Sequence, residues 1–125
     1  MIIRHESEMA VQVRTEVFGG CGSMTVRSML NPDEMAPAGR MFNHFVIPPG
    51  ASIGQHEHVG DTEFYLITAG EGTYYADGEE IAVKAGDITR VDPGHTHGLV
   101  NTSNADLEMI ALILFLGTDA GESTH

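Results

Sequence analysis

Two histidines and a glutamate stand close together in the stretch GQHEHVGDTE, and their types and spacing could bind a metal ion. Side chains alternate faces along a strand, so His56 and His58 would point the same way, about 7 Å apart along the backbone. Glu63 follows a turn at residues 59–62, which lets the next strand run back beside the first. Two imidazoles and one carboxylate form a ligand set suited to divalent first-row transition metals.

A second pair of histidines strengthens the case for a metal site. His95 and His97 lie in the stretch GDITRVDPGHTHGLVN, residues 86–101, which indicates another strand–turn–strand unit. An isolated pair of this kind on a polar loop more often has no function. With His44, however, five of the seven histidines lie on or beside predicted strands in the middle of the chain. This clustering favours a metal site.

Short strands must position these side chains. Fifteen glycines and five prolines interrupt the chain, and no window keeps the three-to-four spacing of a long amphipathic helix. The pattern predicts an all-β chain with strands at residues 11–18, 23–30, 41–47, 52–58, 62–69, 73–77, 80–84, 88–92, 98–102 and 107–115. Their short, regular spacing is typical of a barrel or a sandwich.

Three segments of the chain allow a more specific prediction. The Asp-Gly pair in ADGEE, residues 76–80, supplies the positive φ angles of a tight turn, so residues 73–84 should form a hairpin. The stretch LEMIALILF, residues 107–115, lacks clean alternation, which predicts a last strand buried on both faces. Residues 117–125 have no apolar group to bury and are expected to form a flexible tail.

The composition limits the classes of partner. The length of 125 residues fits one domain, and the formal net charge of −12 opposes binding to nucleic acid or to anionic lipid. No apolar run approaches the roughly 18 residues of a membrane helix, and residues 1–10 lack the apolar stretch of a secretory leader. We therefore expect a cytoplasmic protein with neither nucleic-acid nor membrane partners.

The two histidine clusters resemble the two sequence motifs of the cupin superfamily. The first motif is matched at every position and spacing by Gly50, His56, His58, Glu63 and Gly70. The second motif is matched by Gly86, Gly94, His97 and Asn101, with Asp92 where the family usually has proline. The chain is thus similar to small single-domain cupins, including those called mannose-6-phosphate isomerase-like.

The resemblance implies a double-stranded β-helix, which is a small jelly-roll barrel. Within one domain overall, the barrel would span residues 36–116 and follow N-terminal strands and a loop over residues 1–35. The resemblance also implies four metal ligands, His56, His58, Glu63 and His97. Three imidazoles and one carboxylate leave open positions on a five- or six-coordinate ion, which is the layout of a reactive site. The cofactor would be one divalent transition metal ion: manganese, iron, cobalt, nickel or zinc.

Two further side chains are candidates for catalysis. Tyr65 shares a strand face with Glu63, so it either enters the barrel beside the metal or packs in the core with its hydroxyl at the rim. His44 could shuttle protons near neutral pH if it faces inward. If His44 faces outward, it meets solvent or a subunit interface.

Three basic side chains are candidates for substrate binding. Arg40 and Arg90 are the cations nearest the predicted site in the sequence, and either could hold a carboxylate by a bidentate contact. The alternative for both is a surface position with the stem packed on the barrel. His95 is either a residue of the pocket or its mouth, or an exposed turn histidine.

These features predict a metalloenzyme that acts on a small neutral or carboxylate substrate, of the dioxygenase, decarboxylase or lyase type. One alternative is a sugar or phosphosugar isomerase, for which the six basic residues provide few cations. The other is a non-catalytic module that binds or senses a small ligand. We also expect a homodimer, because the strands over residues 11–30 are longer than one barrel face needs and could pair with a partner's sheet.

Overall fold

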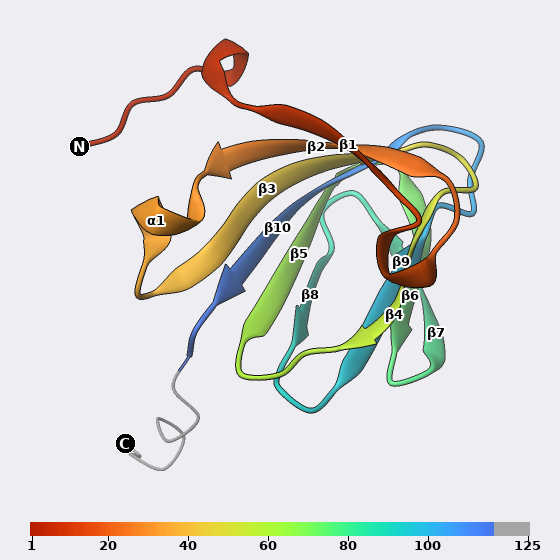
Figure 1. Cartoon of the computed structure of the whole chain (residues 1–125). Helices are drawn as coiled ribbons and strands as arrows, with labels where there is room; N and C mark the ends of the chain where they lie inside the picture. The colour runs from red at the N-terminus through yellow and green to blue at the C-terminus, as the bar shows by residue number, and fades with distance from the viewer. Residues whose placement is uncertain (117–125) are drawn as a thin grey trace.

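Two antiparallel β-sheets form the fold of residues 1–116, the part of the chain that the computed structural model describes (Figure 1). The strands are β1 (Val11–Thr15), β2 (Ser23–Leu30), β3 (Gly39–Ile47), β4 (Ser52–Glu57), β5 (Thr62–Ala69), β6 (Glu71–Ala76), β7 (Glu79–Lys84), β8 (Ile88–Val91), β9 (Thr96–Val100) and β10 (Leu107–Leu114). The helices are η1 (Glu6–Glu8), η2 (Val17–Gly19) and α1 (Pro32–Met35), and none in this part of the chain is long and apolar enough to cross a membrane. Every predicted strand is found, which confirms the all-β prediction. The tail predicted at residues 117–125 lies outside the described residues.

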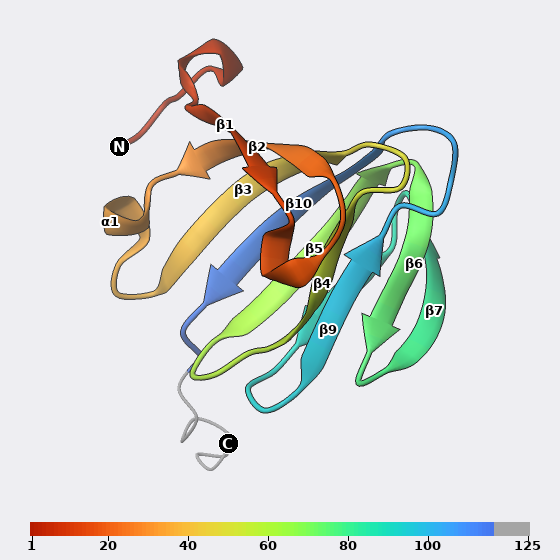
Figure 2. The ribbon, with the colours of Figure 1, turned by 45° about the vertical axis from the view of Figure 1, so that its right-hand side comes forward.

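Strands that are distant in the sequence lie side by side in both sheets. The six-stranded sheet has the order β1-β2-β3-β10-β5-β8, and the four-stranded sheet has the order β4-β9-β6-β7. β10 therefore pairs with β3 along one edge and with β5 along the other. Figure 2 shows the four-stranded sheet in front of the larger one, with the chain passing from sheet to sheet. This arrangement is a jelly roll, and it confirms the predicted double-stranded β-helix.

Apolar side chains from both sheets fill the space between them. Ile47, Ile67 and Leu99 are buried there, one each from β3, β5 and β9. β10 alternates strictly between buried and half-buried residues. The prediction that this strand is buried on both faces is wrong, because outward residues such as Ile110 and Leu112 lie on the outer side of the six-stranded sheet and keep partial exposure.

The turn between β6 and β7 has the conformation that its Asp-Gly pair predicts. Asp77 has φ of 49° and Gly78 has φ of 86°, and positive φ at both central residues is what a tight hairpin of this type requires. The two strands pair in register from Glu71 opposite Lys84 to Ala76 opposite Glu79. The predicted hairpin is confirmed.

β1 and β2 extend the six-stranded sheet at one end (Figure 1). β2 buries Met24 and Val26 in the core, but no residue of β1 is buried. The inner face of the sheet is therefore only partly covered at this end. The connection from β1 to β2 carries η2, which contacts β4 of the other sheet.

Candidate metal centre

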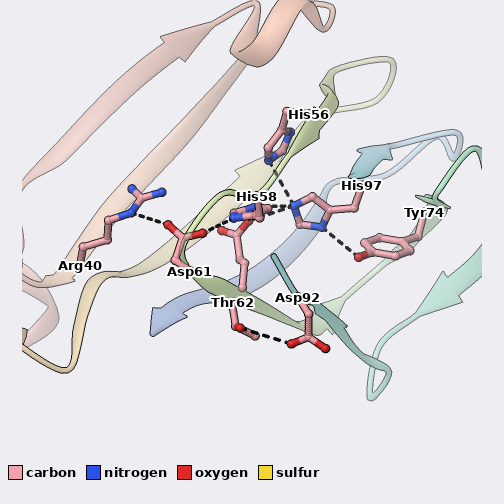
Figure 3. A network of polar contacts seen from close by, with 9 residues as sticks. Arg40, His56, His58, Asp61, Thr62, Tyr74, Asp92 and His97 are labelled. Atoms are coloured by element: carbon pink, nitrogen blue, oxygen red, sulfur yellow. Dashed lines mark hydrogen bonds and ion pairs between the residues drawn. The ribbon is translucent and has the colours of Figure 1, made fainter. Parts of the chain in front are cut away.

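Two strands, one turn and a third strand bring four side chains together between the sheets. His56 on β4 lies opposite His97 on β9. His58 follows the end of β4, and Glu63 lies on β5, beyond the turn. The pairing of β4 with β9 shifts its register between Ile53 and His56, and a bulge of this kind redirects the side chains beside it. The three imidazoles consequently face one another, as Figure 3 shows.

The potential ligand atoms of these residues converge on one point. His97 Nε2 lies 3.1 Å from His58 Nε2 and 3.2 Å from His56 Nε2. Glu63 Oε1 lies 2.9 Å from His58 Nε2 and 3.0 Å from His97 Nε2. One ligand atom from each of the four residues lies within 4.8 Å of all the others. His58, Glu63 and His97 are buried and His56 is half-buried, so this group could hold a metal ion that is accessible from one side.

Each imidazole is fixed through its other nitrogen. His56 Nδ1 donates to the carbonyl oxygen of Gly54 at 2.8 Å, and a carbonyl can only accept. His58 Nδ1 lies 2.6 Å from the Asp61 carboxylate, and His97 Nδ1 lies 2.9 Å from the Tyr74 hydroxyl. When Nδ1 donates, Nε2 presents a lone pair, and such second partners fix the tautomer of metal-binding histidines. The donor set therefore fits a cation.

Burial and hydrogen bonding set the charges within the cluster. Burial lowers the pKa of His56, so its imidazole stays neutral near neutral pH. The hydrogen bond to Glu63 raises the pKa of His58. Burial opposes a charged Glu63, but its hydrogen bonds with His58 and His97 outweigh that effect and lower its pKa. Metal ligands must be deprotonated, so a cation at this cluster would compete with protons for His58 and Glu63.

Asp61 and Arg40 continue the network away from the cluster. Asp61 is only 4% exposed, and its second carboxylate oxygen accepts from Arg40 Nε at 2.9 Å. The chain of contacts Arg40–Asp61–His58 is visible in Figure 3. Sequence reasoning missed Asp61 and Tyr74. Asp61 could have been found, because it lies in the turn three residues after His58, whereas nothing in the sequence joins Tyr74 to His97.

An aromatic ring covers the half-buried histidine. The ring of Phe18, from η2, stacks on His56 with centroids 3.8 Å apart and planes inclined by 12°. The backbone of η2 lies so close to β4 that a Cβ on Gly54 would clash with the Phe18 carbonyl oxygen. Glycine is therefore required at this position of β4. Although Phe18 is 64% exposed, its ring shields one side of the cluster.

A cavity of about 130 Å³ opens beside the cluster, with His56, His58 and Glu63 in its wall. Apolar side chains, Phe18 and Phe45 among them, form most of the remaining wall. Arg14 and Arg40 are its only lysine or arginine side chains among the described residues. Tyr65 also lines this cavity. The space admits a ligand of a few non-hydrogen atoms, since sites for drug-sized ligands measure roughly 300–1,000 Å³.

Two of the other predicted site residues lie at this cavity. Tyr65 is 2% exposed and stacks on His97, with centroids 4.8 Å apart. Burial raises the pKa of Tyr65 well above its usual value, so its phenol stays protonated. Arg40 lines the cavity and contacts Asp61.

The other three predicted site residues lie elsewhere. His44 Nε2 is 3.0 Å from a Glu108 carboxylate oxygen, on the outer side of the six-stranded sheet. Arg90 Nε donates to Asp92 at 2.9 Å, and His95 Nδ1 lies 2.7 Å from Asp77. Arg90 and His95 line a separate recess of about 220 Å³.

Comparisons with known proteins agree with this geometry. A family model described as the cupin domain matches residues 43–113. An oxalate-binding protein of Thermotoga maritima is 36% identical over 116 residues, which are 93% of this chain and 95% of that protein. The crystal structure of a predicted oxalate decarboxylase from Thermotoga maritima has 36% identity and a TM-score of 0.87, covering 93% of this chain and 100% of that one. A Klebsiella pneumoniae protein with a double-stranded β-helix domain is alike in fold alone, with 22% identity and a TM-score of 0.63 over 71% of this chain and 74% of its own.

Proposed function

The chain belongs to the cupin family, and on this basis we propose that it binds a small carboxylate of the oxalate class at a divalent metal ion held by His56, His58, Glu63 and His97. The observation that carries the proposal is the convergence of three imidazole nitrogens and one carboxylate in the wall of a small cavity that also contains arginines. The oxalate-binding relative, 36% identical over 116 residues, supports the ligand class.

The shape and charge of the cavity favour a small anion. Its volume of about 130 Å³ suits a compact ligand, and six of its twelve lining residues are apolar. Arg14 and Arg40 line the cavity in a chain whose formal net charge is −12, and Arg14 is the one of the two that is not paired with Asp61. A carboxylate is more strongly attracted to cations in a partly buried site than in bulk water.

The protein's own side chains orient the site. Asp61 and Tyr74 fix the rings of His58 and His97, and Phe18 covers His56 from the outside. A divalent ion bound here would supply a Lewis acid that attracts and polarises a carboxylate. The protonated phenol of Tyr65, in the same cavity, is a hydrogen-bond donor for that carboxylate.

Turnover of the bound acid is a second candidate function, of the decarboxylase or lyase type. It is supported by the open side of the ligand set and by the likeness to a structure described as a predicted oxalate decarboxylase. Apart from the cluster itself, Tyr65 is the one cavity-lining group of the described residues that could transfer a proton. Because its pKa is raised, Tyr65 is a poor acid, and carboxylate binding is the better-supported function.

Metal analysis and calorimetry test the binding function. Protein stripped with a chelator is reloaded with manganese, iron, cobalt, nickel or zinc and titrated with oxalate. We expect one metal ion per chain, and oxalate binding only to the loaded protein. His97→Ala should lose the metal, whereas His95→Ala, which removes a neighbouring histidine outside the cluster, should keep it. Equal oxalate affinity with and without metal would contradict the proposal.

The same samples distinguish binding from turnover. Carbon NMR of labelled oxalate detects decarboxylation, in which hydrogen oxalate gives formate and carbon dioxide. Formate produced by the loaded protein but not by His97→Ala would establish an enzyme. Unchanged oxalate at full metal occupancy would leave a binding protein.

A further inference from the structure

A polar recess adjoins the metal cavity on the side of β1 and β2. Its volume is about 400 Å³, and it shares Arg14, Arg40 and Met41 with the cavity. The two spaces are therefore neighbours, with the two arginines at their boundary. The recess lies where β1, a strand with no buried residue, extends the six-stranded sheet.

The lining of the recess has an excess of positive charge. It contains Arg14 and Arg40 and no acidic residue, although the chain has 18 acidic and 6 basic side chains. Arg40 Nε donates to Asp61, but its terminal nitrogens donate to no acceptor within residues 1–116. The one side-chain hydrogen bond of Arg14 in this part of the chain is a contact of 3.5 Å with Gln12, at the limit for such a bond. Several guanidinium donors are thus available.

A buried amide in the same recess has no protein partner. Asn43 lies on β3 opposite Ser28 of β2, and both residues line the recess together with Gln12. Asn43 is 4% exposed, yet its side-chain amide makes no hydrogen bond to any residue in the described range. Its amide atoms are not among the fully buried side-chain atoms that lack a partner in the described residues, so they are open to the recess. The amide is therefore available to a molecule that enters the recess.

We propose that this recess is a second ligand subsite that binds a carboxylate group. The proposal rests on the function proposed above: a dicarboxylate places one carboxylate in the metal cavity and the other in the recess. Arg14 presents the planar fork of donors that matches a carboxylate, and Asn43 adds an N–H donor. Dicarboxylic acids with a carbon spacer then bind more tightly than monocarboxylic acids of the same length.

Calorimetry on the metal-loaded protein tests this preference. Succinate and butyrate have the same number of carbons and differ by one carboxylate, and malonate and glutarate vary the spacer. We expect the best dicarboxylate to bind about 10- to 100-fold more tightly than its monocarboxylate counterpart, the range for a charge-assisted contact. Arg14→Gln should remove most of this preference. Lys84→Gln removes the same charge from an exposed position on β7 and should leave the preference unchanged.

A second measurement reports on the recess without the metal. In metal-free protein, the side-chain NH₂ signal of Asn43 is followed by nitrogen–proton NMR during titration with the same acids. We expect the signal to shift on addition of a carboxylate in wild type, and to shift much less in Arg14→Gln.

The two measurements separate the two proposals. If loaded protein binds oxalate, but the Asn43 signal is unmoved and Arg14→Gln keeps the wild-type preference, the recess is no subsite and the metal-site function stands. If no carboxylate binds better to loaded than to stripped protein, while the Asn43 signal shifts, the recess binds carboxylates and the metal-site function fails.

Discussion

Replacing Asp61 tests whether the network outside the metal cluster determines metal affinity. Asp61 accepts from His58 Nδ1 at 2.6 Å and from Arg40 Nε at 2.9 Å. It therefore holds the His58 ring in the orientation and tautomer that direct Nε2 at the other three candidate ligands. Asp61→Asn keeps an oxygen of similar position but removes the negative charge beside the imidazole.

The structure indicates the size of the effect. The loss of such an outer partner lowers metal affinity by about 10- to 100-fold, which is about 1.4 to 2.7 kcal/mol. The side chain of Asp61 is 6% exposed, so water screens its charge little. Since the asparagine oxygen can still accept from His58, Asp61→Asn should lie near the lower end of the range. Asp61→Ala removes the acceptor and should lie near the upper end.

Competition with a coloured chelator measures the affinity for zinc or cobalt, and the absorption of bound cobalt reports the ligand geometry. Asp92→Asn is the matched control, because the Asp92 side chain contacts Thr62 and Arg90 rather than the imidazole of a candidate metal ligand. Thermal unfolding of the metal-free variants verifies that both fold. If Asp61→Asn bound zinc as tightly as Asp92→Asn, the role assigned to Asp61 would be refuted.

Three further outcomes are expected. Phe18→Ala should lower the free energy of unfolding by about 0.5–1.5 kcal/mol, the value of an aromatic pair, as measured by urea denaturation. A loss above about 3 kcal/mol would mean that this exposed ring contributes as much as a core residue. The hydrogen bond from Arg4 lowers the pKa of Glu34 from 4.5 to about 2, so this pair stabilises the fold above pH 4.5 and the effect is lost as pH falls towards 2. The difference in stability between wild type and Glu34→Gln, measured by thermal unfolding, should shrink over that interval. A constant difference would exclude the mechanism. We propose a homodimer through the open edge of β1, so light scattering should give the mass of two chains. Val13→Asp, at a position 70% exposed in the single chain, should shift the measured mass towards that of one chain. A monomeric wild type would refute the homodimer.

The strands and the grouping of His56, His58 and Glu63 could be predicted because both depend on local patterns. Turn residues separate the strands at short intervals, and β2 and β5 begin and end where the sequence predicts. The spacing of His56, His58 and Glu63 follows from alternation along one strand and one turn. The cupin motifs added His97, and the structure brings these four residues together.

The remaining features of the site could not be predicted because they depend on contacts between distant segments. Alternation shows which residues share a face but not which face is inward, so the outward position of His44 beside Glu108 was open. Phe18 reaches His56 through a loop whose path depends on close backbone contact with Gly54. Tyr74 contacts His97 because β6 pairs with β9. The sequence of either strand alone does not predict which strand it pairs with.

The central place of β10 has a consequence for synthesis of the protein on the ribosome. β5, which carries Glu63, is paired on one side with β10 and on the other with β8. β3 is likewise paired with β10 on one side. A nascent chain that stops before Leu107 contains all four candidate metal ligands but lacks the strand that joins β3 to β5. Because such long-range pairing forms late and slowly, the metal centre should be assembled only after residues 107–114 have left the ribosome. Until then the exposed strand edges are open to aggregation.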